Sequence, residues 1–121
     1  MKRITFLAGV GAVSAAAVFF ALSPFAGART TAQTKTTISV KAAEFKFTLS
    51  KKSAPHGVVV FKVTNKGALK HDFKIAGKKT PLLRHGQAAT LKVTLTKGRH
   101  KYICTVKNHA FYGMKGVFKA T

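Results

Sequence analysis

The chain has 121 residues, with 22 Lys and Arg against two Asp and Glu, so its formal net charge is +20 at pH 7. This length fits one domain, and an apolar fraction of 46% is too high for a disordered basic tail. With only Glu44 and Asp72 as acids, catalysis by paired carboxylates is nearly excluded. The single Cys excludes an intramolecular disulfide and a redox centre made of two cysteines.

Residues 1–28 have the pattern of an export signal. The short basic head formed by Lys2 and Arg3 precedes a long uncharged stretch that ends in small residues at 26–28. We predict a signal peptide that is cleaved after Ala28. The alternative is an uncleaved membrane anchor, because the uncharged run is long enough to span a bilayer. In both cases the rest of the chain is exported and works in the periplasm or outside the cell.

The polar residues 29–37 predict a short linker, which places the folded domain at 38–121. Removing the signal peptide takes away two basic residues and neither acid, so the charge changes from +20 to +18. A domain of this size buries a small core, and a bound metal could therefore add real stability.

The domain alternates apolar and polar residues with period two in several short segments, as half-buried strands do. Turn residues separate these segments, and none of them shows the 3.6-residue period of a helix. The pattern predicts an all-β sandwich. The predicted strands are 45–49, 58–64, 72–75, 91–95, 101–106 and 116–120.

The same alternation explains much of the positive charge. Five lysines have apolar neighbours on both sides and should project away from the core. A solvated lysine face that protects strand edges is favoured over a polyanion-binding patch, because most Phe alternate inward instead of standing exposed for base stacking. Nucleic acid is therefore not an expected partner, whereas peripheral contact with an anionic envelope surface stays open. The five are Lys46, Lys62, Lys74, Lys92 and Lys119.

Four residues form a candidate metal site. Cys104, His109 and Met114 follow one another as C-x4-H-x4-M between two predicted strands, and His71 lies upstream, after a turn. Two imidazoles, one thiolate and one weak thioether are the ligands of a mononuclear blue-copper site. A single Cys or Met is more often a core residue. The four together, in this order, indicate one copper ion that cycles between Cu(I) and Cu(II).

Five other residues are assigned from their positions. His56, His85 and His100 lie beside turns, so we expect them to be exposed and not to bind metal. Phe111 and Tyr112 lie inside the ligand loop. They are either packing residues or an apolar docking surface around His109, and the sequence leaves both possibilities open.

The sequence resembles the cupredoxin family, which includes plastocyanins, azurins, and rusticyanin-like and auracyanin-like proteins. The resemblance rests on residues 102–116, YICTVKNHAFYGMKG, and on VTNKG and HDF within 63–73, and it extends over about 38–120. It implies a Greek-key β-sandwich. The copper ligands that it implies are His71, Cys104, His109 and Met114.

Two positions depart from the family pattern. Relatives commonly have Asn after the first His, where this chain has Asp72, which could still accept a hydrogen bond from Thr105. An added carboxylate here should favour Cu(II) and lower the potential. Many relatives have Pro-Gly before the second His, where this chain has Lys107 and Asn108. Asn tolerates a left-handed turn, but without proline the loop is expected to be looser.

The sequence lacks the marks of a copper enzyme. It contains no His-x-His motif, and four protein ligands leave no open position for substrate. We therefore expect a monomeric type 1 (blue) copper protein that is not an enzyme and carries one electron at a time in the cell envelope. Its redox partners should have acidic docking surfaces, and the resemblance implies His109 as the electron exit. The alternatives are a copper carrier, chaperone or scavenger, and an interaction module for anionic cell-surface polymers.

Overall fold

The computed structural model describes residues 35–121. The predicted signal peptide and cleavage site lie outside the described residues and stay predictions. Strand β1 (Thr36–Ala43) begins two residues before the predicted start of the domain. Residues 36 and 37, which were predicted to belong to the linker, therefore pair with β4 in a sheet. None of the described residues belongs to a helix long and apolar enough to cross a membrane.

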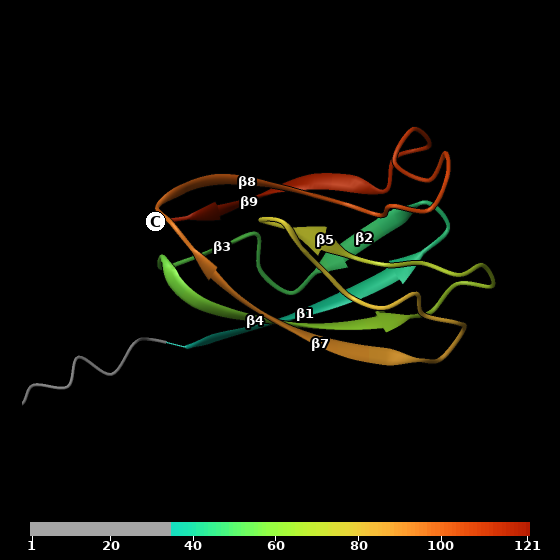
Figure 1. The fold of residues 1–121 in the computed structure, drawn as a ribbon, viewed down its shortest axis with the longest axis horizontal. Coiled ribbons are helices and arrows are strands. Elements are labelled where there is room, and N and C mark those ends of the chain that lie inside the picture. Colours follow the sequence, from blue (N-terminus) through green and yellow to red (C-terminus); the bar gives the residue numbers. More distant parts are fainter. Residues whose placement is uncertain (1–34) are drawn as a thin grey trace, which may run out of the picture. The chain divides into compact units, whose positions relative to one another are not determined.

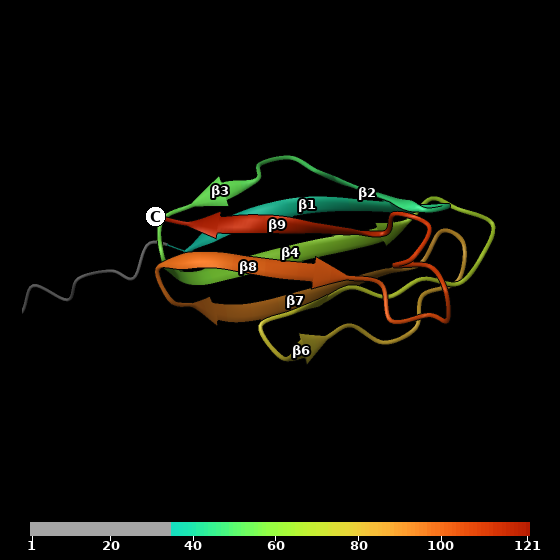
Figure 2. The ribbon, with the colours of Figure 1, turned by 90° about the horizontal axis from the view of Figure 1, so that it is seen from above.

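The described residues form nine strands in two sheets that face each other (Figures 1 and 2). The first sheet has the order β2-β1-β4-β7 and the second has the order β3-β9-β8-β5-β6. β1 pairs with β4 and β3 with β9 in parallel, and the other pairs are antiparallel. After β1, the strands are β2 (Lys46–Leu49), β3 (Ser53–Ala54), β4 (Gly57–Asn65), β5 (Lys74–Ile75), β6 (Lys78–Lys79), β7 (Ala88–Leu95), β8 (Gly98–Ile103) and β9 (Lys115–Ala120).

The all-β sandwich predicted from the sequence is confirmed, and most predicted strands match observed ones. The prediction missed β1, although its buried Ile38, Val40 and Ala42 alternate with polar or exposed positions. The predicted strand 101–106 was wrong at its end, because β8 stops at Ile103. The chain leaves the sheet there because the next residues begin the loop that returns to β9.

The predicted lysine face is confirmed. All five lysines that alternate with apolar residues are exposed, while their neighbours in the strands point into the sandwich. The two-residue edge strand β6 consists of two exposed lysines. Charged edges of this kind discourage pairing with a second sheet.

The core between the sheets is mostly aliphatic and contains a cluster of packed aromatic rings. Phe61, Phe73 and Phe118 are fully buried, and the ring of Phe61 lies 5.2 Å from that of Phe73 and 5.3 Å from that of Phe118. In the sandwich, β4 and β8 end, and β9 begins, at the same end (Figures 1 and 2). The loops that follow β4 and β8 therefore lie together there, opposite the C-terminus (Figure 1).

Candidate metal centre

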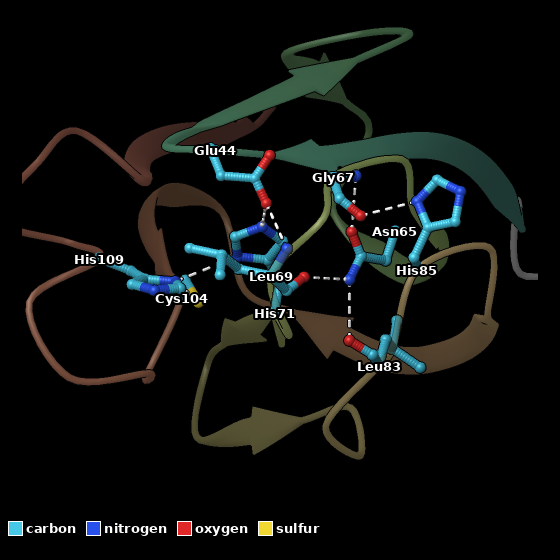
Figure 3. A network of polar contacts seen from close by, with 9 residues as sticks. All are labelled: Glu44, Asn65, Gly67, Leu69, His71, Leu83, His85, Cys104 and His109. Carbon is cyan, nitrogen blue, oxygen red and sulfur yellow. Dashed lines mark hydrogen bonds and ion pairs between the residues drawn. The ribbon is translucent and has the colours of Figure 1, made fainter.

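Three of the predicted ligands converge at this end of the sandwich. The donor atoms of His71, Cys104 and His109 all lie within 4.8 Å of one another, and the three side chains are buried. Nδ1 of His109 lies 3.1 Å from Nδ1 of His71 and 3.6 Å from Sγ of Cys104 (Figure 3). Metal–ligand bonds of about 2.0 Å to nitrogen and about 2.3 Å to sulfur would let one ion contact donors at these separations. The observed spacing fits one ion.

Met114, the fourth predicted ligand, lies beside this cluster and is fully buried. Its carbonyl accepts a hydrogen bond from the amide of Cys104 at 3.0 Å, and its amide donates to the carbonyl of His109 at 3.1 Å. The backbone of Met114 is thus hydrogen-bonded to that of Cys104 and to that of His109. The structure therefore brings all four predicted residues to one place.

The ligand loop between β8 and β9 reverses direction through two residues with positive φ. Asn108 has φ of 67° and Gly113 has φ of 120°. Asn is among the few side chains that adopt the left-handed region readily, and Asn108 uses that tolerance at this turn. The turn lets the amide of His109 donate to the carbonyl of Val106 at 3.0 Å, which directs the imidazole inward. The looser loop expected from the missing proline stays a prediction.

Asp72 connects the two segments that carry the ligands. Its carboxylate accepts hydrogen bonds from the backbone amide of Thr105, at 2.6 Å, and from the Thr105 hydroxyl. Hydrogen bonds to an ionised carboxylate are about twice as strong as neutral ones. The residue after His71 is therefore bound to the residue after Cys104, as the sequence suggested for Asp72.

Glu44 holds His71 from the other side, and the sequence analysis did not identify it. Its Oε1 lies 3.1 Å from Nε2 of His71 and accepts a hydrogen bond from the amide of Leu69 at 2.6 Å (Figure 3). The hydrogen bond from Leu69, followed by smaller contributions that include His71, lowers the pKa of Glu44 to about 2. Glu44 lies 27 residues before His71, so the only signal in the sequence was the rarity of acids.

Asn65 was also missed, and it shapes the segment that leads to His71. Its side-chain amide donates to the carbonyls of Leu69 and Leu83 at 2.7 and 2.8 Å, and its carbonyl oxygen accepts from the amide of Gly67 at 2.8 Å. Asn65 is fully buried. Because all these partners are backbone groups, the conformation of the segment depends on this one amide.

Burial shifts the pKa values of two ligand residues. Burial raises the pKa of the Cys104 thiol. Hydrogen bonds from the backbone amides of Asp72 and Val106 lower this pKa, but by less than burial raises it. Because the thiolate is the form that binds metal, uptake of an ion must release this proton. Burial also lowers the pKa of His109, and the neighbouring His71 lowers it further. His109 thereby favours the neutral imidazole that binds metals.

The other three histidines lie outside the cluster, as expected. His56 and His85 are exposed, and each contacts a backbone carbonyl at 2.7 Å. The prediction that His100 is an exposed turn residue was wrong. It lies within β8, is half-buried, and contacts the carbonyl of Thr96 at 2.7 Å.

The surface beside the cluster is largely apolar. Phe111 and Tyr112 are 83% and 59% exposed, and the ring of Tyr112 also packs against that of Phe45, with centroids 5.0 Å apart. Phe45 packs edge-on against the ring of His109, with centroids 5.1 Å apart. A shallow hollow beside the ligand loop is lined by Ala68, Leu69, Lys70, Val106 and His109.

Several solved structures share this fold. An auracyanin from Roseiflexus castenholzii, described as reduced with dithionite, superposes with a TM-score of 0.64 at 21% identity, covering 71% of this chain and 97% of its own. Auracyanin B has a TM-score of 0.61 at 20% identity, covering 74% and 90%. Auracyanin A from Chloroflexus aurantiacus, described as a "blue" copper protein, has a TM-score of 0.56 at 18% identity, covering 72% and 99%. No curated protein matches the sequence.

The sequence also matches a family of known proteins. The model of the copper-binding proteins of the plastocyanin/azurin family matches residues 27–120, most of the chain. The donor set agrees with that family, because a thiolate, two imidazoles and a nearby thioether suit copper. Copper is accordingly the cofactor, and the chain belongs to the plastocyanin/azurin family of copper-binding proteins.

Proposed function

We propose that this protein is an exported one-electron carrier that holds one type 1 copper ion. The observation that carries the proposal is the buried convergence of two imidazoles and one thiol within 4.8 Å. Copper bound by this set is stable as both Cu(I) and Cu(II), which is the chemistry that electron transfer requires. The proposed ligands are His71, Cys104, His109 and Met114.

The residues around the ligands suit this role because they restrict movement. Asp72 ties the two ligand segments together, and Glu44 holds the outer nitrogen of His71. Ligands held in place by protein hydrogen bonds move little when the charge of the ion changes, and small movement makes electron transfer fast. Four protein ligands also leave no open coordination position, so we propose a carrier and not an enzyme.

Electrons would enter and leave at His109. Its side chain lines the shallow surface hollow, and the exposed rings of Phe111 and Tyr112 belong to the same loop. These apolar groups could contact a redox protein whose surrounding surface is acidic, since the mature domain would carry a charge of +18 after losing two of the 22 basic residues. Opposite charges accelerate such encounters.

The copper site is tested by adding Cu(II) to the purified protein. We expect intense visible absorption from thiolate-to-copper charge transfer, reversible bleaching by a reductant, and loss of the absorption in Cys104→Ser. A parent protein that stays colourless would refute the blue-copper proposal. Ready release of Cu(I) to an acceptor, without stable redox cycling, would instead identify a copper carrier or scavenger.

The role of charge is tested by stopped-flow electron transfer with a physiological donor. We expect the bimolecular rate to fall as ionic strength rises, because salt screens attraction beyond about 10 Å at 0.1 M. Rates that do not depend on salt would contradict acidic docking. Binding to anionic cell-surface polymers that survives loss of His71 and Cys104 would favour an interaction module.

Export is tested by sequencing the N-terminus of the protein recovered from its host. Cleavage after Ala28 predicts a mature protein that begins at Arg29. A mature chain that keeps the apolar run would identify a membrane anchor instead.

A further inference from the structure

Glu44 contacts the ring of the proposed copper ligand His71 as well as the backbone of the segment that leads to it. It lies in the turn between β1 and β2 and is one of only two acids in the chain. The single oxygen Oε1 contacts Nε2 of His71 at 3.1 Å and the amide of Leu69 at 2.6 Å. Figure 3 shows the carboxylate directed at both groups.

Gly67 leaves the space that this carboxylate occupies. A Cβ at position 67 would lie 2.7 Å from Oε2 and 2.8 Å from Cδ of Glu44, which is closer than non-bonded atoms approach. The Gly67 amide is itself held by Asn65 at 2.8 Å. Any side chain at position 67 would therefore displace the Glu44 carboxylate. The absence of a side chain at Gly67 lets the carboxylate lie against the segment that leads to His71.

The two ring nitrogens of His71 have different partners. Nε2 contacts Glu44, while Nδ1 lies 3.1 Å from Nδ1 of His109 inside the cluster. An ionised carboxylate only accepts hydrogen bonds, so Nε2 must carry the hydrogen in this contact. In the neutral ring, Nδ1 then keeps the lone pair that a metal needs. The ring is fully buried, so water does not compete for these positions.

We propose that Glu44 is a positioning residue that sets the tautomer of His71 and, through its negative charge, favours Cu(II) over Cu(I). This inference rests on the proposed copper site. A carboxylate on the outer nitrogen of a ligating His orients the ring and increases its basicity. A nearby negative charge also stabilises the more positive oxidation state. The side chain of Glu44 is 32% exposed, so water screens part of this effect.

The charge is tested with Glu44→Gln, because glutamine keeps an oxygen that can accept both hydrogen bonds. We expect the variant to retain the blue absorption and to shift its Cu(II)/Cu(I) equilibrium toward Cu(I) by about tenfold, which raises the reduction potential by about 59 mV for one electron. An unchanged potential would overturn the proposal. Loss of the blue absorption in a variant that still folds would also overturn it, because the carboxylate would then be required for the copper site to form and would not merely tune it.

Thr94→Lys is the matched control. It changes the net charge by the same amount as Glu44→Gln, +1, at an exposed position of β7. Thr94 pairs with Val58 near the start of β4, whereas the ligand segment follows the other end of that strand. We expect the control to leave the potential at the parent value. An equal rise in both variants would assign the effect to net charge and not to the Glu44–His71 contact.

The tautomer is tested by ¹⁵N NMR of the imidazoles in the protein without copper. We expect the hydrogen of His71 on Nε2 in the parent, and a mixture of tautomers in Glu44→Ala and in Gly67→Ala. A parent with the hydrogen on Nδ1 would overturn the proposal even in a blue protein. If the parent never becomes blue, the function proposed above fails, whereas the NMR result still decides the tautomer.

Discussion

At the scale of single residues, both acids of this chain act beside the metal centre. Glu44 contacts the ring of His71, and Asp72 binds the amide and hydroxyl of Thr105. Within residues 35–121 neither acid pairs with a lysine or arginine, although the full chain has 22 basic residues. Within the part of the chain that the structure describes, the carboxylates therefore hold the ligand segments and form no ion pair with a basic side chain of the surface.

Removal of the Asp72 carboxylate should destabilise the fold and weaken the retention of copper. Asp72→Ala leaves the part-buried amide of Thr105 without its charged partner, and we expect a loss of about 1.5–3 kcal/mol in unfolding free energy, with copper dissociating about 10–100-fold faster. Thr105→Val removes only the hydroxyl, so it should cost about 1 kcal/mol. Urea unfolding and copper transfer to a chelator measure both effects. If both variants lost the same unfolding free energy, the bond between the Asp72 carboxylate and the Thr105 amide would contribute nothing beyond the bond to the hydroxyl, contrary to this prediction.

Tyr102 predicts a dependence of stability on alkaline pH. Burial raises its pKa above the ordinary value of 10.0, so the folded state keeps the proton longer than the unfolded state does. The protonated Tyr102 therefore contributes its full share to the free energy of unfolding below pH 10. That contribution is lost as the pH rises through the higher pKa of the folded state.

The measurement is the difference in unfolding free energy between the parent and Tyr102→Phe from pH 9 to about pH 11. We expect the parent to lose stability relative to the variant as pH rises, while lysine titration, common to both proteins, cancels. Tyr112→Phe, at an exposed ring, controls for the loss of a phenol. A constant difference would argue against the burial effect.

At the scale of elements, the ligand loop depends on its backbone conformation as well as on its ligands. The loop carries Cys104, His109 and Met114 between β8 and β9, and its first reversal is at Asn108, with φ of 67°. β8 and β9 pair up to Ile103 and Lys115, so the strands hold both ends of the loop at a fixed separation. The loop conformation therefore determines where the donor atoms meet.

Substitutions at Asn108 should follow the cost of positive φ. Asn108→Gly is expected to leave stability within about 0.5 kcal/mol of the parent, whereas Asn108→Val should cost about 1–2 kcal/mol because a β-branched side chain is strained there. Thermal unfolding of the two variants measures the difference. If Val proved as stable as Gly, the left-handed turn would not be maintained in solution.

At the scale of the whole molecule, charge opposes folding. Most lysines project from the strands into solvent, and few acids compensate for them. The compact state brings like charges closer than the unfolded chain does, and this self-repulsion destabilises it. The apolar core and the hydrogen bonds around the metal centre must offset that cost.

Salt should therefore stabilise this protein against heat. Raising sodium chloride from about 10 mM to about 1 M shortens the screening length from about 30 Å to about 3 Å, and we expect a higher Tm at the higher concentration. Differential scanning calorimetry at fixed pH measures this, and a non-ionic osmolyte controls for effects unrelated to charge. A Tm that falls with salt would mean that attraction between charges outweighs repulsion.

The sequence predicted the fold class and the four candidate ligands because their signals are local. Period-two alternation identifies strands, and the C-x4-H-x4-M spacing places three of the four candidates on one loop. The same alternation explained the exposed lysines. Strand ends were less certain, as β8 shows, because the residue at which pairing stops depends on contacts with another segment.

Contacts between distant segments are what only the tertiary structure decided. Glu44 meets His71 across 27 residues, and Asn65 reaches Leu83 across 18. No periodicity or spacing in the sequence indicates either contact, because both contacts depend on how the two sheets pack. The sequence by itself determined which atoms can bind copper. The fold decided how those atoms are held, since hydrogen bonds of fixed direction form only after the loops have been brought together.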